Sequence, residues 1–218
     1  MIDRETTTRF GLIRHASSQW NEQKRIQGQK DSPLSPGGRK QARTWGKELS
    51  CYPWQRILCS DLERARETAA LINTTLRLPL TVEPELREQD WGRWSGLTLV
   101  RLREIDPDLL QQQVREGWNF APPEGESRLE VMKRAMTALR QAGNRYPEEY
   151  ILVVCHEGVI KCVLYRLLHR RFLPEEPQVI LDYHLHLLEL RQQNLYLTGL
   201  NRLALRGRVK ISLNDSGE

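Results

Sequence analysis

Three short apolar runs along the chain each stop abruptly at a polar or charged residue. They span residues 10–13, 57–59 and 150–155. Apolar runs of this length, rich in Val, Ile and Leu, are typical of strands buried on both faces of a parallel sheet. Ligands of open α/β sheets bind beyond the carboxyl ends of such strands. The pattern therefore predicts a binding site where the ends of these three strands meet.

Helix start signals lie between the apolar runs, so predicted strands and helices alternate. Ser35, followed by proline, predicts a helix that runs through about Leu49. Capping boxes, in which Ser precedes Glu by three residues, predict helices that open at Ser60 and at Ser127. The last of these helices is expected to run toward Asn144.

The remaining pattern completes the predicted fold. Residues 98–120 are expected to form one or two helices broken by Pro107, which cover the mouth of the pocket. Residues 183–190 and 195–200 predict two late strands around a turn. The alternation favours an α/β three-layer sandwich, a mostly parallel central sheet with helices on both faces. We expect a single domain over residues 1–206 and a polar C-terminal tail over residues 207–218.

Composition adds limits on the partners and on the compartment. The 218 residues include 33 Lys and Arg against 28 Asp and Glu, a formal net charge of +5, which favours anionic partners. The basic residues are dispersed apart from a cluster over residues 202–210, which we interpret as solvated, so we expect no nucleic-acid partner. Residues 1–9 lack the apolar core of a signal peptide, and no apolar run approaches the length of a membrane span. Three of the four cysteines lie in apolar contexts without Cys-x-x-Cys spacing, as in reduced thiols. We predict a cytoplasmic protein with no membrane partner.

The residues at the strand ends carry the candidate chemistry. Arg14 and His15 offer an anion clamp beside a nucleophile or base, and Arg64 adds a charged fork near a helix N-terminus, which itself attracts anions. His156 ends the third run. Each of these residues alone is typical of a surface pair or a structural histidine, but three strand ends with the same character favour a site. Glu88, in a loop rich in glycine and tryptophan, could donate a proton to a leaving oxygen.

Several blocks of the sequence together resemble the histidine phosphatase superfamily, the phosphoglycerate mutase-like group. They occur in the family's order: LIRHASSQWN, RIQGQKDSPLSPGGRKQA, CSDLERARETA, LREQDWGRWSG, PEGES and VVCHEGVIK. The resemblance implies a phosphoglycerate mutase-like fold, with His15 as the phosphorylated nucleophile and Glu88 as the proton donor. It also implies a phosphate pocket formed by Arg14, Asn21, Arg64 and His156, with neither a metal nor a cofactor.

The resemblance further implies a phosphatase that hydrolyses small phosphate monoesters through a phosphohistidine. Such an enzyme is a phosphomonoesterase of the histidine acid phosphatase type, and its partner is a small phosphorylated metabolite. One alternative is a 2,3-bisphosphoglycerate-dependent phosphoglycerate mutase, although those relatives usually carry a longer insertion before the second histidine. Another is a non-catalytic module that binds phosphate or nucleic acid on the same fold. The oligomeric state stays open, with a dimer possible.

Two residues depart from the family pattern, because Ala16 and Glu157 stand where glycine is usual. Ala16 suits any backbone with negative φ. Glu157 would repel phosphate if it faced the pocket, and we expect its side chain to point away. His184 and His186 alternate on one predicted strand face, and without a third ligand nearby we predict a structural role.

The loops around the pocket are expected to recognise the leaving group. Candidates are Gln27, Gly28, residues 87–93 and the cover over residues 101–120. Trp118 and Phe120 would either form an apolar wall for the substrate or pack the cover onto the domain. Three arginines of the cover would suit a second phosphate or carboxylate, namely Arg101, Arg103 and Arg115.

Overall fold

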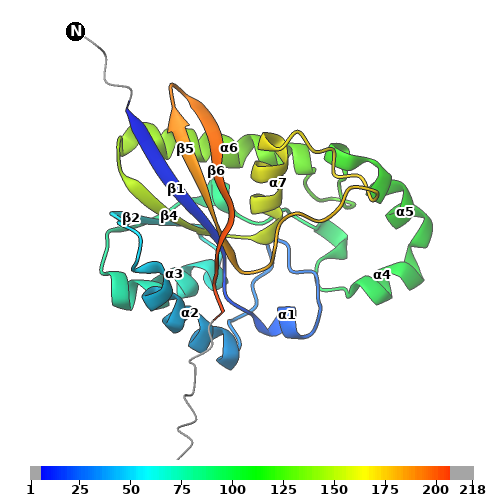
Figure 1. The fold of residues 1–218 in the computed structure, drawn as a ribbon. Helices are drawn as coiled ribbons and strands as arrows, with labels where there is room; N and C mark the ends of the chain where they lie inside the picture. The colour runs from blue at the N-terminus through cyan, green and yellow to red at the C-terminus, as the bar shows by residue number, and fades with distance from the viewer. Residues whose placement is uncertain (1–5, 207–218) are drawn as a thin grey trace, which may run out of the picture.

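A six-stranded mixed sheet, in the order β3-β2-β4-β1-β5-β6, forms the centre of the molecule in a computed structural model that describes residues 6–206 (Figure 1). The strands are β1 (Thr7–Arg14), β2 (Arg56–Cys59), β3 (Leu80–Val82), β4 (Tyr150–Cys155), β5 (His184–Arg191) and β6 (Asn194–Ala204). The first four run parallel, whereas β5 and β6 pair in antiparallel fashion. The predicted α/β class with a mostly parallel sheet is confirmed. The predicted tail over residues 207–218 lies outside the described residues.

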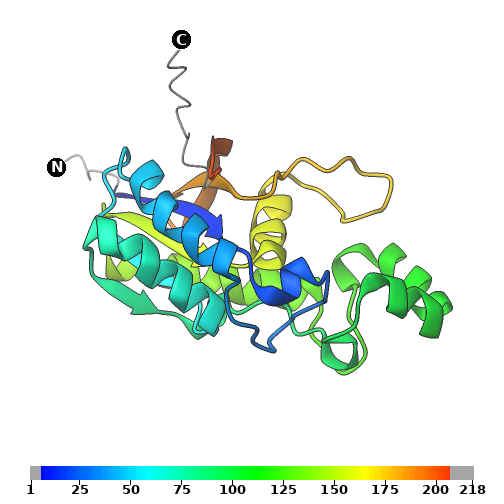
Figure 2. The same cartoon turned by 90° about the horizontal axis from the view of Figure 1, so that it is seen from below.

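Helices cover both faces of the sheet (Figures 1 and 2). On one face, α2 (Pro36–Leu49) and α3 (Glu63–Leu76) bury Trp45 and Ile72 in an apolar cluster with β2 and β4. On the other, α6 (Arg128–Arg145) and α7 (Glu157–Leu167) bury Leu139 and Val163. None of the helices among residues 6–206 combines the length and apolar character that a membrane crossing needs.

The hydrogen bonds at the helix N-termini confirm two of the three predicted caps. The Ser35 hydroxyl accepts the N–H of Gly38, and Ser127 forms a capping box with Glu130, as predicted. The predicted box at Ser60 is wrong, because α3 begins at Glu63 after Leu62 and has no side-chain cap from this segment. The Ser60 hydroxyl is instead bonded to His156.

The segment around Pro107 forms two short helices, α4 (Leu99–Ile105) and α5 (Pro107–Arg115), as predicted. They lie at the side of the molecule, beyond the short helix α1 (Gln19–Glu22) (Figure 1). Three short 3₁₀ turns also flank this region: η1 (Pro84–Leu86), η2 (Gly92–Trp94) and η3 (Gly117–Asn119). Leu102 packs with Trp94 and Phe120 in a separate small core. This core holds the two helices against the loop that contains Glu88.

Candidate active site

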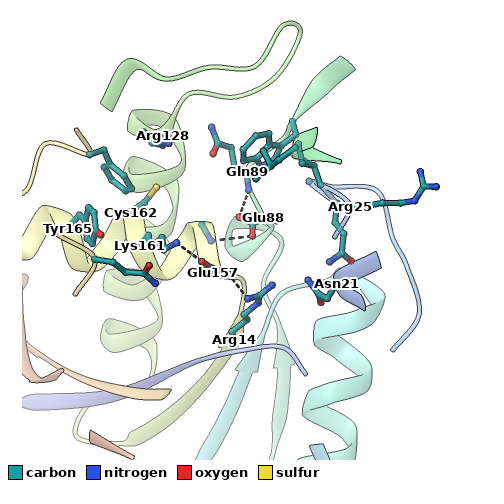
Figure 3. A pocket seen from close by; sticks show the side chains of 18 of the residues that line it. Arg14, Asn21, Arg25, Glu88, Gln89, Arg128, Glu157, Lys161, Cys162 and Tyr165 are labelled. Carbon is teal, nitrogen blue, oxygen red and sulfur yellow. Dashed lines mark hydrogen bonds and ion pairs between the residues drawn. The ribbon is translucent and has the colours of Figure 1, made fainter. Parts of the chain in front are cut away.

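The carboxyl ends of β1 and β4 open onto a cleft of about 760 Å³ (Figure 3). Seven of the eight residues predicted for the site line this cleft: Arg14, His15, Asn21, Gln27, Gly28, Arg64 and Glu88. The eighth, His156, is fully buried beside His15, and their ring centroids lie 5.2 Å apart. The fold therefore brings all eight predicted residues together.

Both ring nitrogens of His15 have a protein partner, and together the two contacts define which nitrogen carries the proton. Its Nδ1 lies 2.8 Å from the carbonyl oxygen of Ala16, an acceptor, so the proton of the neutral ring belongs on Nδ1. Nε2 then carries the lone pair and accepts the Nε–H of Arg64 at 3.3 Å. Burial, followed by the charges of Arg64 and Arg14, holds the pKa of His15 well below its ordinary value. The ring is therefore neutral at physiological pH and presents a nucleophilic Nε2.

Arg64 is fixed on several sides. Its Nη2 donates to the carbonyl oxygen of Gly28 at 2.7 Å, and its Nη1 donates to the carbonyl oxygen of Lys30 and to Asp31, both at 3.0 Å. The side chain is fully buried, and burial lowers its pKa. A guanidinium stays charged even so, because its ordinary pKa is far above neutral. Arg64 therefore places a permanent positive charge next to His15.

Asp31 is a positioning residue that the sequence did not reveal. One carboxylate oxygen accepts the N–H of Glu63, at the start of α3, at 2.9 Å. The other binds Arg64. Asp31 thus supplies the helix cap expected from Ser60 and orients Arg64 at the same time. Only its place in the block RIQGQKDSPLS could have marked it, since it lies 32 residues from Glu63 along the chain.

The expectation that the Glu157 side chain points away from the pocket is wrong. Glu157 lines the cleft and binds Arg14. The Glu157 Oε2 and the Arg14 Nη1 are 2.5 Å apart, and Lys161 pairs with the other oxygen (Figure 3). Burial opposes ionisation of Glu157, but these two cations outweigh it and lower its pKa. The Nε of Arg14 is buried without a protein partner in the described part of the chain, so it remains available to a ligand.

The pKa of Glu88 is shifted in the direction opposite to that of His15. Its carboxylate accepts the backbone N–H of Gln89 at 2.8 Å and that of Gly158 at 3.2 Å. Burial raises its pKa above the ordinary carboxyl value, although these hydrogen bonds and the charge of Arg64 limit the rise. A Cβ at position 158 would overlap the Glu88 carboxylate, so a side chain there would displace it. The side chain of Arg134 also holds the backbone of the loop by donating to the Glu88 carbonyl oxygen at 3.1 Å.

His156 is oriented by Ser60, whose hydroxyl lies 2.8 Å from its Nε2. The same hydroxyl accepts the N–H of Leu62 at 3.3 Å. The Nδ1 of His156 is buried and has no protein partner within residues 6–206. Burial and the charge of Arg64 lower its pKa well below the ordinary value, so the ring is neutral.

The remaining predicted residues form the wall opposite Glu157. The Asn21 Oδ1 accepts the backbone N–H of Ser18 at 3.0 Å, and the Ser18 hydroxyl lies 2.9 Å from the Gln27 Oε1. Gly28 has a φ of +55°, and a Cβ there would crowd the backbone of Trp91. This wall is therefore held by its own hydrogen bonds before any ligand arrives.

Ala16 is accommodated without strain. It is fully buried, it is not among the left-handed residues of the described chain, and its N–H donates to the Thr68 hydroxyl at 3.0 Å. The replacement of the usual glycine therefore leaves the strand end intact.

Leu99 is the one residue of the predicted cover, residues 98–120, that lines the cleft. Trp118 donates its indole N–H to the Arg170 carbonyl oxygen and packs edge-on against Phe172, and Phe120 is buried in the small core. None of Arg101, Arg103 and Arg115 lines the cleft. The outer wall comes instead from α7 and from residues 172–178, which the sequence pattern did not single out.

The cleft is lined by cations, amides and His15, with His156 buried behind His15, and three carboxylates also line it, namely Glu88, Glu157 and Glu176. The cations, amides and imidazoles form a donor set that suits a phosphoryl group. No group of three or more His, Cys, Asp or Glu side chains among residues 6–206 is arranged to hold a metal ion. His186 accepts the N–H of Asn201 at 3.2 Å within the sheet, and burial lowers its pKa to about 4.

Comparison with known proteins agrees with this geometry. The chain is 32% identical over 153 residues to an uncharacterized phosphatase, PhoE, of Bacillus subtilis, which covers 70% of this chain and 74% of the relative. It is 33% identical over 157 residues to a probable phosphoglycerate mutase, GpmB, of Cronobacter sakazakii, which covers 72% and 73%. The solved structure of Bacillus stearothermophilus YhfR superposes with a TM-score of 0.82 at 28% identity, over 91% of this chain and 98% of that chain. A family model matches residues 10–202, and the chain belongs to the histidine phosphatase superfamily (branch 1).

Proposed function

We propose that this chain is a phosphatase that hydrolyses small phosphate monoesters through a phosphohistidine at His15. The observation that carries the proposal is that one cleft holds His15, whose Nε2 faces Arg64, and the carboxyl group of Glu88. Their environments shift the two pKa values in opposite directions. The pKa of His15 is lowered, which favours the neutral ring with a lone pair, and the pKa of Glu88 is raised, which favours the protonated carboxyl. Titratable groups pushed apart in this way mark a nucleophile or base and an acid.

The first step transfers the phosphoryl group to the protein. Arg14, Arg64 and the amide nitrogen of Asn21 bind the phosphoryl oxygens and stabilise the charge that develops on them. The His15 Nε2 attacks phosphorus while the bond from phosphorus to the leaving oxygen breaks. Glu88 gives its proton to that oxygen, and the alcohol departs.

The second step returns His15 to its starting state. The ionised Glu88 takes a proton from water as the water oxygen attacks phosphorus, and the bond between phosphorus and Nε2 breaks. Inorganic phosphate leaves, Glu88 is protonated again, and His15 is neutral. His156 assists both steps if the Ser60 hydroxyl donates to its Nε2, because its proton then lies on Nδ1 and can be donated to a phosphoryl oxygen.

Replacement of the nucleophile tests the proposal. His15→Ala is expected to lower the turnover of phosphate monoesters by roughly 10³-fold or more, because only binding and electrostatics remain. Rapid quenching with a radiolabelled substrate should trap an acid-labile phosphoprotein in the wild type and none in His15→Ala. His184→Ala, which removes a half-buried histidine of β5, is the matched control and should keep both signals. Undiminished turnover by a pure His15→Ala preparation would contradict the proposal.

The mutase is the second candidate, and the similarity to a probable phosphoglycerate mutase favours it. A mutase would pass the phosphoryl group of His15 to a hydroxyl of a second phosphorylated ligand rather than to water. Isomerisation of 3-phosphoglycerate, primed with 2,3-bisphosphoglycerate, distinguishes the two activities. We expect hydrolysis to be faster, and efficient isomerisation would replace the phosphatase assignment.

A further inference from the structure

The cleft extends well beyond the space that a phosphoryl group occupies. Its inner end is marked by Glu88, which binds the N–H of Gly158 in the first turn of α7. The cleft then follows α7, and the residues of one helix face line it in turn: Gly158, Lys161, Cys162 and Tyr165. At a rise of 1.5 Å per residue, this face is about 10 Å long. The leaving group of a bound phosphate monoester therefore has room to lie along α7 toward Tyr165.

Arg128 lies at the outer end of this face. Figure 3 shows it at the start of α6, on the other side of Cys162 from Arg14. Its guanidinium carbon is 4.1 Å from the ring centroid of Phe120 and 4.6 Å from that of Phe172. Its Nη1 donates to the carbonyl oxygen of Gly117 at 3.0 Å. The two rings and this bond hold the guanidinium in place, and its remaining N–H groups have no hydrogen-bond partner among residues 6–206.

The other cations of the cleft are either paired or exposed. Glu157 is shared by Arg14 and Lys161, Asp31 binds Arg64, and Lys24 and Arg25 lie exposed at the rim. Arg128 differs from all of them, because it is half-buried and no carboxylate among residues 6–206 lies within ion-pair distance of it. Burial lowers its pKa to about 10.

The carboxylate at this end of the cleft does not neutralise Arg128. Glu176 lines the outer cleft, but its oxygens accept the backbone N–H groups of Arg171 and Leu173 at 3.0 and 3.1 Å. It is directed at its own loop. A partly buried cation without a counter-charge is unfavourable, and a ligand anion would remove the penalty.

We propose that the outer end of the cleft is a subsite for a second anionic group, with Arg128 as the residue that determines specificity for it. The proposal rests on the phosphatase function above and names its substrate class. The substrate is a phosphate monoester whose leaving group has an apolar middle, packed against Tyr165, Phe172 and Leu173. Its far end bears a carboxylate or a second phosphate, which the guanidinium of Arg128 binds.

Matched synthetic substrates test the subsite. Para-carboxyphenyl phosphate and para-carbamoylphenyl phosphate have nearly the same shape and differ in the distal charge, and para-phenylene bisphosphate carries a distal phosphate instead. We expect the wild type to prefer the carboxylate over the amide by about 10-fold in kcat/KM, the size of a charge-assisted hydrogen bond. The bisphosphate distinguishes a subsite for phosphate from one for carboxylate.

Two variants test whether Arg128 is the residue that causes the preference for the distal carboxylate over the amide. Arg128→Gln keeps a donor for the Gly117 carbonyl oxygen but removes the charge, and it should bring the preference close to unity. Arg25→Gln removes the same charge from the exposed rim and should keep it. A loss of activity in Arg128→Gln that is equal for both substrates, or a preference that disappears in Arg25→Gln, would show that Arg128 is only structural and overturn the inference.

Binding separates this inference from the phosphatase proposal. Calorimetry with the non-hydrolysable para-carboxybenzyl and para-carbamoylbenzyl phosphonates measures the same preference without turnover. If His15-dependent hydrolysis is absent but the wild type alone prefers the carboxylate, the phosphatase proposal fails and the subsite stands. If hydrolysis depends on His15 but neither assay shows a preference, the subsite fails and the phosphatase stands.

Discussion

At the inner end of the cleft Arg14 and Arg64 are each paired with a carboxylate and Glu88 accepts two backbone N–H groups, whereas at the outer end Arg128 has one hydrogen bond, two aromatic rings and no ion pair within residues 6–206. Groups fixed in advance do not have to reorganise when charge develops, which suits the reacting phosphoryl group. A cation left without a counter-charge suits recognition of a varied leaving group. Under the two proposals above, the same cleft separates a reaction centre at its inner end from a mouth that selects the leaving group.

The two ends also differ in the elements that build them. Arg14 ends β1, His156 follows β4 and Arg64 lies in the first turn of α3, whereas Glu88 lies in the loop between η1 and η2. The strands and helices of the inner end pack in the main core. The outer wall includes residues 172–178, in a stretch between α7 and β5 that contains neither helix nor strand. Segments of this kind tolerate sequence change more readily than core elements. Relatives with the same reaction centre can thus differ in the substrates they accept.

Of the substitutions at the inner end, removal of the Arg64 guanidinium should lower phosphatase activity most. Arg64→Met is expected to lower kcat/KM for any phosphate monoester by about 10³-fold, because an arginine that stabilises transferring phosphoryl charge is worth that much. Steady-state kinetics with a small aryl phosphate measures the effect. Arg66→Met, an exposed residue of the same helix, is the control. Near-normal activity in a folded Arg64→Met, verified by circular dichroism, would contradict the inner assignment.

Replacement of the acid should have an effect that depends on the leaving group. Glu88→Gln is expected to slow hydrolysis of alkyl phosphates by roughly 10²-fold to 10⁴-fold, because their alkoxides need a proton to depart. Para-nitrophenyl phosphate needs no proton, so a burst of nitrophenol should precede slow breakdown of the phosphohistidine. Glu85→Gln, exposed in the same loop, should behave as the wild type. Equal losses for both classes of substrate would rule out Glu88 as the acid.

The pH profile follows from the same two groups. Activity requires unprotonated His15 and protonated Glu88. Because burial lowers the pKa of His15, activity should persist as pH falls below the ordinary imidazole range. Because burial raises the pKa of Glu88, activity should decline with rising pH only above the ordinary carboxyl range. Glu88→Gln should keep the acidic limb of kcat/KM and lose the alkaline limb, and an unchanged alkaline limb would assign it to another group.

A variant that moves the Glu88 carboxyl group but keeps the residue tests whether the position of this group matters for catalysis at the inner end. Gly158→Ala places a methyl group where the carboxylate lies, so we expect about a 10-fold loss with alkyl phosphates and less with para-nitrophenyl phosphate. Gly37→Ala is the control, because a Cβ there meets only ordinary contacts. A loss confined to KM would show that Gly158 serves binding instead of the position of Glu88.

The inner end could be predicted from the sequence because its residues follow strong local signals. Apolar runs and caps such as Ser35 fix where strands and helices end, and parallel strands bring their carboxyl ends to one edge. Asp31 and the outer wall could not be predicted, since their roles arise from the packing of segments distant in sequence. At Ser60 the local pattern and the packing of distant segments favour different hydrogen bonds. The local pattern favours a cap on α3, but the hydroxyl binds His156.

Glu157, whose direction the sequence also failed to predict, provides the smallest and most specific test. Its carboxylate pairs with Arg14 and adds negative charge to the wall of the cleft, so we expect it to compete with a bound phosphate. Glu157→Gln keeps the shape but removes the charge, so inorganic phosphate should inhibit about 5-fold more strongly, the scale of one charge at short range in a partly solvated site. Asp182→Asn, 4.0 Å from Arg14 and largely exposed, is the control and should leave inhibition unchanged. Weaker inhibition in Glu157→Gln would mean that the carboxylate acts mainly by orienting Arg14, so that even the inner end depends on a residue outside the family pattern.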